Sequence, residues 1–395
     1  MAGRRQTHVS DLRGVGTVAL DATRGLIDLV DTVQHTIACG PGILGLPRAG
    51  PPRGIAGFVS RSLRELTGLL GGGIDVALAE LARVIGEART WQEVEAVLAA
   101  LNGALGDYLA STGNPLAIRM QLRRGGRSLE VQQRALRWAL PGASRKLLLL
   151  VHGSSRGDLE WNRQGHDHGA ALERDRGWVA VYLNYNSGLH VSTNGRAFAA
   201  LLEALVAQWP ASLEELAIVA HGMGGLVSRS ACHAAAAAGH RWPAWLRKMV
   251  FLGTPHQGLE RGGSFIDLTL GSGPHRAPFA RLGRIRSAGL ADLCRGCLLD
   301  EDWERDGQDR QPVPLPAGVD CFAIAAVRTR DGSGRLPGDG LVPLDSALDR
   351  HANPELALGF PESRTWIGKG MNHLDLLSRP EVYEVLSRWL SPPSK

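Results

Sequence analysis

Five short segments of the chain join small residues to side chains that could relay protons during acyl transfer. They lie at 151–154, 216–225, 251–258, 338–343 and 371–375. The last two contain Asp339 and His373, and a carboxylate beside an imidazole can fix the ring tautomer while the ring shuttles a proton. A lone Asp-Gly or His-Gly is usually a turn, and a single histidine among thirteen is usually an ordinary one. Five such segments in order over about 225 residues are much harder to explain as turns.

The region that must position these segments consists of short apolar runs that alternate with helical stretches from Lys146 onward. This alternation is typical of a parallel α/β sheet. The predicted strands are 147–151, 179–185, 216–220, 249–252, 321–327 and 365–367. The predicted helices are 195–208, 223–238 and 380–390. Each of the five segments overlaps or follows one of the predicted strands, so the sheet would bring them to a common edge.

The first part of the chain has a different pattern. Residues 10–112 carry apolar side chains three or four positions apart in four stripes, which predicts helices. The fourth stripe starts at Thr90-Trp-Gln-Glu93, a sequence that fits a capping box. We therefore predict a helical N-terminal region at 1–125 and an α/β domain at 126–395 with a cap-like insertion at about 256–316. The apolar stripes would pack on the rest of the chain, the simpler interpretation, or contact a membrane surface.

The segment Leu216-Ala-Ile-Val-Ala-His-Gly-Met-Gly-Gly225 resembles the nucleophile elbow of the α/β-hydrolase superfamily, whose usual form is Gly-x-Ser-x-Gly. Phe251-Leu-Gly-Thr-Pro-His256 resembles a segment of bacterial lipases and of hydrolases similar to GPI-inositol deacylase. The resemblance covers residues 146–390. It implies an α/β-hydrolase fold, hydrolysis of carboxylic esters through an acyl-enzyme, and no cofactor.

The resemblance also assigns roles to individual residues. Asp339 would be the triad acid, with Asp331 and Asp345 as nearby alternatives, and His373 the triad histidine. The backbone N–H groups of Ser154 and Met223 would hold the oxyanion. The substrate-binding residues are expected to be His152, Gly153, His221, Trp161 and Tyr185, and position alone adds Asn184 and Asn194. His166 and His168 lack a third partner at metal-ligand spacing, so no metal site is expected.

Gly222 stands where the superfamily has its nucleophilic serine, and glycine has no side chain to attack with. Three explanations stay open. The natural protein could have serine at this position, with this chain an inactivated variant. The chain could instead be a natural pseudo-hydrolase that binds a ligand or partner in the old pocket. Finally, His373 could activate a water and support slow hydrolysis.

Composition excludes other function classes. Lys and Arg number 44 against 39 Asp and Glu, giving a net charge of +5 without a concentrated basic stripe, so no nucleic-acid partner is expected. The sequence has no stretch of 18 apolar residues and no secretory h-region. We expect a cytoplasmic protein, in contact with membranes at most peripherally, whose substrate is a small-molecule or lipid ester. The sequence leaves acyl length, head group and oligomeric state open.

Overall fold

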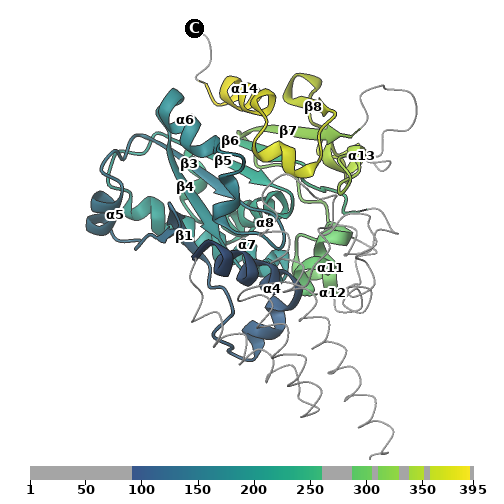
Figure 1. Cartoon of the computed structure of the whole chain (residues 1–395), viewed down its shortest axis with the longest axis horizontal. Coiled ribbons are helices and arrows are strands. Elements are labelled where there is room, and N and C mark those ends of the chain that lie inside the picture. The colour runs from purple at the N-terminus through teal and green to yellow at the C-terminus, as the bar shows by residue number, and fades with distance from the viewer. Residues whose placement is uncertain (1–90, 260–286, 305–309, 329–337, 351–355, 392–395) are drawn as a thin grey trace, which may run out of the picture.

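The computed structural model describes residues 91–259, 287–304, 310–328, 338–350 and 356–391 (Figure 1). The first three predicted helical stripes and the proposed cap residue Thr90 lie outside these ranges. The fourth stripe forms helix α4, Trp91–Ser111.

Eight strands form one sheet in the order β2-β1-β4-β3-β5-β6-β7-β8. The strands are β1 Gln121–Arg124, β2 Arg127–Ser128, β3 Lys146–Val151, β4 Val179–Asn184, β5 Glu215–His221, β6 Leu246–Leu252, β7 Asp320–Val327 and β8 Thr365–Lys369. From β4 to β8 all neighbours are parallel, whereas β1 pairs antiparallel with both β2 and β4. The six predicted strands are thus present as β3 to β8, and the α/β-hydrolase fold predicted for the chain is observed.

Helices cover both faces of the sheet (Figure 1). The α-helices after α4 are α5 Gln133–Ala139, α6 His168–Arg176, α7 Val191–Gln208, α8 Met223–Ala238, α11 Ala288–Arg295, α12 Asp300–Glu304, α13 Leu344–Ala347 and α14 Pro380–Trp389. Short 3₁₀ helices lie at Asp158–Trp161, Trp242–Trp245, Glu362–Arg364 and His373–Leu377.

The core is divided by the sheet, because successive strand side chains point to opposite faces. Leu147 and Leu149 pack in one core with residues of α7 and α8, including Phe198 and Leu226. Leu148 lies in a second core, shared with α6 and α14. Burial on both faces explains why the central strands read as continuous apolar runs.

Strand β1 lies before residue 125, at which the helical N-terminal region was predicted to end, and it belongs to the sheet. Its Arg123 is buried and forms ion pairs of 2.8 Å with both Glu95 of α4 and Asp158. The described part of α4 is therefore tied to the sheet by a buried charge cluster.

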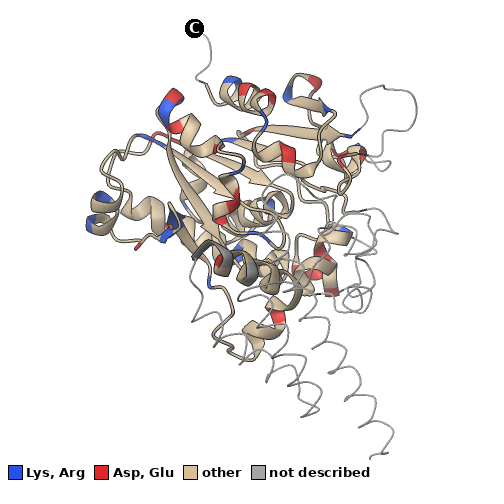
Figure 2. Ribbon diagram, viewed as in Figure 1, with Lys and Arg blue, Asp and Glu red and all other residues tan. Residues whose placement is uncertain are grey.

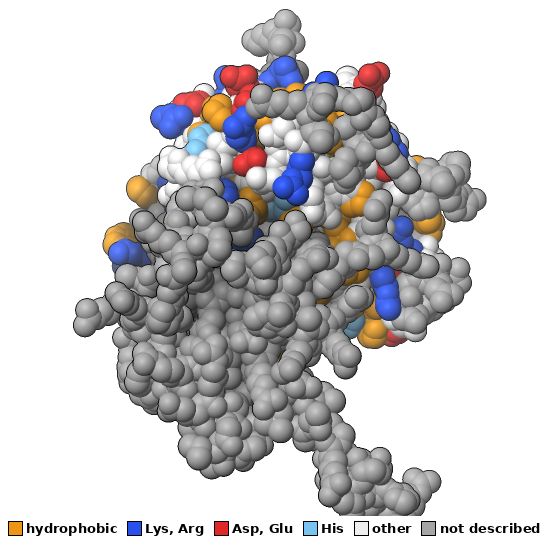
Figure 3. All heavy atoms as spheres, turned by 45° about the vertical axis from the view of Figure 1, so that its right-hand side comes forward, with side chains coloured by type: hydrophobic (Ala, Val, Ile, Leu, Met, Phe, Trp, Pro, Cys, Tyr) orange, Lys and Arg blue, Asp and Glu red, His pale blue; other side chains and the backbone are white. Residues whose placement is uncertain are grey.

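Charged residues of both signs are interspersed over the described elements. In the ribbon of Figure 2 basic and acidic residues are mixed, and Figure 3 shows basic, acidic and hydrophobic side chains scattered over the described part of the face drawn. Within the described part of the chain, every helix is too short or too polar to span a bilayer.

Candidate active site

The turn between β5 and α8 has the strained geometry of a nucleophile elbow. Gly222 is the single residue between them, with φ +52° and ψ −121°, a region that favours glycine. Its N–H donates to the Leu252 carbonyl oxygen at 2.9 Å, which ties the turn to β6. At Gly224 an added Cβ would lie 2.5 Å from the Val151 carbonyl oxygen, so a side chain does not fit where helix and strand approach each other.

An acid–base pair lies beside this turn. Nδ1–H of His373 donates to Oδ2 of Asp339 at 2.7 Å. The other carboxylate oxygen, Oδ1, accepts the N–H groups of Leu341 at 2.9 Å and Val342 at 2.8 Å. With Nδ1 used as the donor, Nε2 of the neutral ring is left as the proton acceptor. The structure therefore brings Asp339 to His373, as expected, whereas Asp345 is exposed and contacts Arg350; Asp331 lies outside the described residues.

Position 222 faces that acceptor nitrogen. A Cβ built on Gly222 would lie 3.1 Å from Nε2 of His373 and 3.6 Å from its Cε1. This contact is tighter than usual, and the imidazole would move by a few tenths of an ångström to admit it. A serine hydroxyl, one bond further, would then be within hydrogen-bond reach of Nε2, the arrangement that activates a nucleophile.

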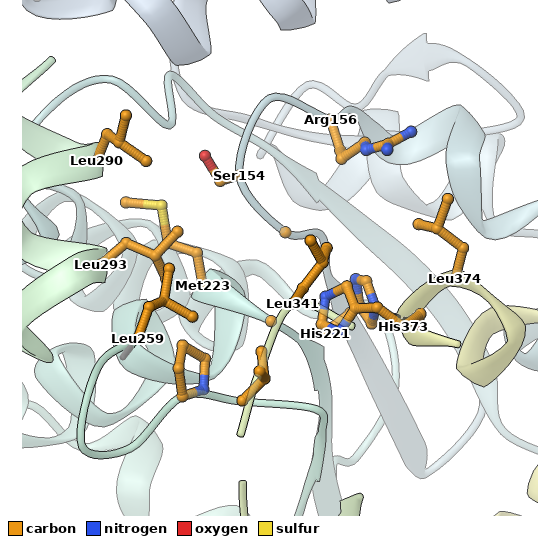
Figure 4. Close-up of a pocket in the computed structure, with 14 residues that line it drawn as sticks. Ser154, Arg156, His221, Met223, Leu259, Leu290, Leu293, Leu341, His373 and Leu374 are labelled. Carbon is orange, nitrogen blue, oxygen red and sulfur yellow. Dashed lines mark hydrogen bonds between the residues drawn. The ribbon is translucent and has the colours of Figure 1, made fainter. Parts of the chain in front are cut away.

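The expected oxyanion residues lie on the same pocket (Figure 4). Met223 is the first residue of α8, and the first N–H groups of a helix have no acceptor within it. Ser154 follows β3, and the next residue, Ser155, has φ +58° and donates its N–H to Oγ of Ser187 at 2.9 Å. The tight loop is thereby fixed with Ser154 at the pocket wall.

Two of the predicted substrate-binding residues, His152 and Tyr185, are buried and bond to the backbone of this loop. Nδ1–H of His152 donates to the Gly153 carbonyl oxygen at 2.8 Å, and the ring stacks on Tyr185 with centroids 4.2 Å apart. The Tyr185 hydroxyl donates to the His152 carbonyl oxygen at 2.9 Å. Burial lowers the pKa of His152 to about 4, so the ring is neutral at neutral pH.

The remaining predicted residues divide between wall and interior. Gly153 and His221 line the pocket, and Nε2–H of His221 donates to the backbone oxygen of His373 at 3.1 Å. Burial, with His373 nearby, lowers the pKa of His221 well below its ordinary value. Trp161, in contrast, is 1% exposed in the core shared with α6 and α14. His152, Trp161 and Tyr185 are not among the lining residues.

Asn184 and Asn194 are buried as well, and Asn194 donates to the Asn186 carbonyl oxygen at 2.9 Å. Nε2 of His166 lies 2.8 Å from Nδ1 of His168, and within the described ranges no group of three or more His, Cys, Asp or Glu side chains is placed to hold a metal.

The pocket beside position 222 contains about 550 Å³ of empty space, a figure that includes its open mouth. The lining residues that the sequence did not single out are Arg156, Pro255, Leu259, Leu290, Leu293, Leu341, Val342 and Leu374. A signal existed for some of them. Arg156 is two residues after Ser154, and Leu290 and Leu293 have helical spacing within the predicted insertion.

Helix α4 holds two parts of the site. Its Gly103 lies so near the loop after β3 that an added Cβ would be 2.7 Å from Cα of Ser155. On its other side, the Gly103 carbonyl oxygen accepts Oγ–H of Ser287 at 2.7 Å, and Asp107 accepts the N–H of Ala288 at 2.9 Å, at the start of α11. α4 thus connects the Ser154 loop to the helix that carries Leu290 and Leu293.

Comparison with known proteins finds no matching family model and no curated protein similar in sequence. Solved structures with a similar course include a lipase from Bacillus licheniformis, BlEst2 in mature form, at 17% identity over 62% of this chain and 92% of that one, with a TM-score of 0.43. An esterase from the archaeon Pyrobaculum calidifontis is 14% identical over 80% of this chain and 95% of its own, with a TM-score of 0.40. Lipase B of Aspergillus fumigatus is 14% identical over 67% and 58%, with a TM-score of 0.39.

Proposed function

We propose that this chain is built on the scaffold of a carboxylic ester hydrolase of lipase or esterase type. With glycine at position 222 it binds an ester without forming an acyl-enzyme. The observation that carries the proposal is the 3.1 Å between a Cβ at Gly222 and Nε2 of a histidine already oriented by Asp339. A nucleophile there would have its base in place, and acyl transfer splits one difficult step into two easier ones.

The roles of the other residues follow from this assignment. Asp339 orients His373, and His373 takes a proton from the attacking group and returns it to the leaving oxygen. The N–H groups of Ser154 and Met223 stabilise the negative charge on the carbonyl oxygen in the transition state. Each task is served by a group of this chain, and none of them needs a cofactor.

A second candidate, a natural pseudo-hydrolase that binds a ligand, is favoured by one observation. Glycine adopts φ +52° without the backbone strain that a serine would carry, so the turn with Gly222 is unstrained. Both candidates use the same pocket. They differ in whether a serine side chain introduced at position 222 gives ester hydrolysis.

The test is the hydrolysis of p-nitrophenyl esters of several acyl lengths by the chain and by Gly222→Ser. Gly239→Ser is the matched control, because Gly239 ends the same helix, also at positive φ, with open space around its Cα. We expect Gly222→Ser to exceed Gly239→Ser by on the order of 10³-fold or more in kcat/KM, and to trap an acyl group detectable by mass spectrometry.

Two outcomes contradict the proposal. If Gly222→Ser is no faster than Gly222→Ser/His373→Ala at any acyl length, the hydrolase scaffold is rejected and the ligand-binding candidate is preferred. If the unchanged chain already hydrolyses esters and loses that activity in His373→Ala, water activated by His373 replaces the serine mechanism.

A further inference from the structure

The pocket has two chemically different ends, one beside Met223 and the other beside His373 (Figure 4). On one side Leu259, Leu290 and Leu293 lie together with Met223. On the other side, near His373, lie the guanidinium of Arg156 and the apolar side chain of Leu374. A bound ester that crosses position 222 must therefore place one half among leucines and the other near a cation.

The proton relay fixes which half goes where, an inference that rests on the proposed function. The histidine of a serine hydrolase returns its proton to the leaving alcohol oxygen, so the alcohol half of the ester lies next to Nε2. In Figure 4 His373 and Arg156 lie on the side of the pocket away from Leu259, Leu290 and Leu293. The alcohol half consequently faces Arg156, and the acyl half enters the leucine-lined end.

Charges around Arg156 leave it available to a ligand. Its Nη1 donates to Glu160, four residues further on, and the Arg156 side chain is 33% exposed. A guanidinium has five N–H donors, so this ion pair does not exhaust it. Arg163 adds a second nearby cation, while the carboxylate of Asp375 accepts the N–H of Asn372. Among the described residues that line the pocket there is no Asp or Glu, so the Glu160 carboxylate that pairs with Arg156 lies outside this lining.

We infer that the ester for which this pocket is built has an apolar acyl chain and an anionic group, carboxylate or phosphate, on its alcohol half. In the Gly222→Ser variant the hydroxyl oxygen attacks the carbonyl carbon while His373 accepts its proton. The bond from that carbon to the alcohol oxygen then breaks, and the same proton passes to this oxygen as the anionic alcohol leaves. Water cleaves the acyl-enzyme, giving the carboxylic acid and restoring the hydroxyl. The unchanged chain binds the same ester intact.

Three probes test this inference. 4-Butanoyloxybenzoate carries a carboxylate on its alcohol half, 4-butanoyloxyphenyl phosphate carries a phosphate, and methyl 4-butanoyloxybenzoate is the neutral match. Calorimetry gives the Kd of each compound for the unchanged chain. Steady-state hydrolysis assays with the Gly222→Ser variant give kcat/KM for the same compounds. We expect an anionic probe to bind about 5-fold more tightly than the neutral ester at low salt, because a partly exposed charge pair is worth about 1 kcal/mol, and we expect the preference to shrink as salt is added. The better of the two anions identifies the group.

The preference must depend on Arg156. We expect Arg156→Gln to reduce it to within about 2-fold and Arg156→Lys to retain part of it, because lysine keeps the charge without the guanidinium fork. Arg137→Gln, an exposed arginine on α5, is the matched control and should leave the preference unchanged.

Equal binding of neutral and anionic probes, no binding of any probe, or an unchanged preference in Arg156→Gln overturns the inference. Neutral esters hydrolysed by Gly222→Ser would then still support the proposed function. If the anionic preference is measured but Gly222→Ser hydrolyses none of the probes, the ligand class holds as a binding property and the hydrolase proposal fails.

Discussion

The two halves of the site are held in place by different means. Asp339 and His373 depend on each other through a side-chain hydrogen bond of 2.7 Å, with two backbone N–H groups fixing the carboxylate. The elbow depends on the backbone alone, through φ +52° at Gly222 and its hydrogen bond to β6. Under the proposed function, the chain would keep the position of a nucleophile without the nucleophile itself, because φ at Gly222 and the bond from its N–H to β6 need no side chain there.

The largest effect should come from breaking the acid–base half. In the Gly222→Ser background, Asp339→Asn should lower kcat on the order of 10³- to 10⁴-fold with little change in KM, because the amide no longer enforces the tautomer that leaves Nε2 as acceptor. Steady-state kinetics measures this. Asp345→Asn, an exposed carboxylate six positions along the chain, should leave kcat unchanged, and a comparable loss there would contradict the assignment of Asp339.

The loop beside the elbow should be sensitive to acid through His152. An unfolded histidine takes up a proton near pH 6.5, but buried His152 does so only near 4. The neutral His152 ring contributes its full stabilisation above about pH 6.5. This contribution is lost as pH falls toward 4, and the loss reaches roughly 3 kcal/mol there. Urea unfolding at pH 7 and 4.5 should show a smaller pH-dependent loss in His152→Gln than in the unchanged chain, while exposed His233→Gln should match the latter. Equal losses in all three would show that His152 titrates normally.

The smallest effect concerns the elbow itself. Gly222→Ala should reduce the free energy of unfolding by about 1–2 kcal/mol, because an L-residue at positive φ is strained. Gly239→Ala has a similar φ without neighbours, so the excess cost at 222 measures the contact with His373. Chemical denaturation gives both values. If Gly222→Ala were as stable as the unchanged chain, the positive φ at this turn would be wrong.

Sequence patterns predicted the central architecture well because burial on both faces makes parallel strands continuously apolar. The helix at 223–238 was predicted with its observed bounds, since it starts directly after the elbow and ends at Gly239. β1 was missed. Its four residues, Gln-Leu-Arg-Arg, show no apolar pattern, and Arg123 is buried only because Glu95 and Asp158 accompany it from elsewhere in the chain.

The sequence predicted which residues lie together where their position along the chain decides it, and less well where the orientation of a side chain does; their catalytic roles stay predictions. Asp339 and His373 follow strand ends, and the parallel sheet brings those ends together. Trp161 and Tyr185 are near the site in sequence but turn into the interior, which no spacing rule indicates. Arg156 reaches the pocket through the path of the loop after β3, a path set by contacts with α4 and Ser187.

The position of α4 has a consequence for the order in which the molecule assembles. Gly103 and Asp107 bond to Ser287 and Ala288, partners 184 and 181 residues away, and the histidine lies further on still. Contacts between such distant residues close large loops and form slowly. During synthesis α4 can make these contacts only after Ser287 has emerged, and Asp339 can pair with His373 only after β8, so the pocket is complete only when the sheet behind it is.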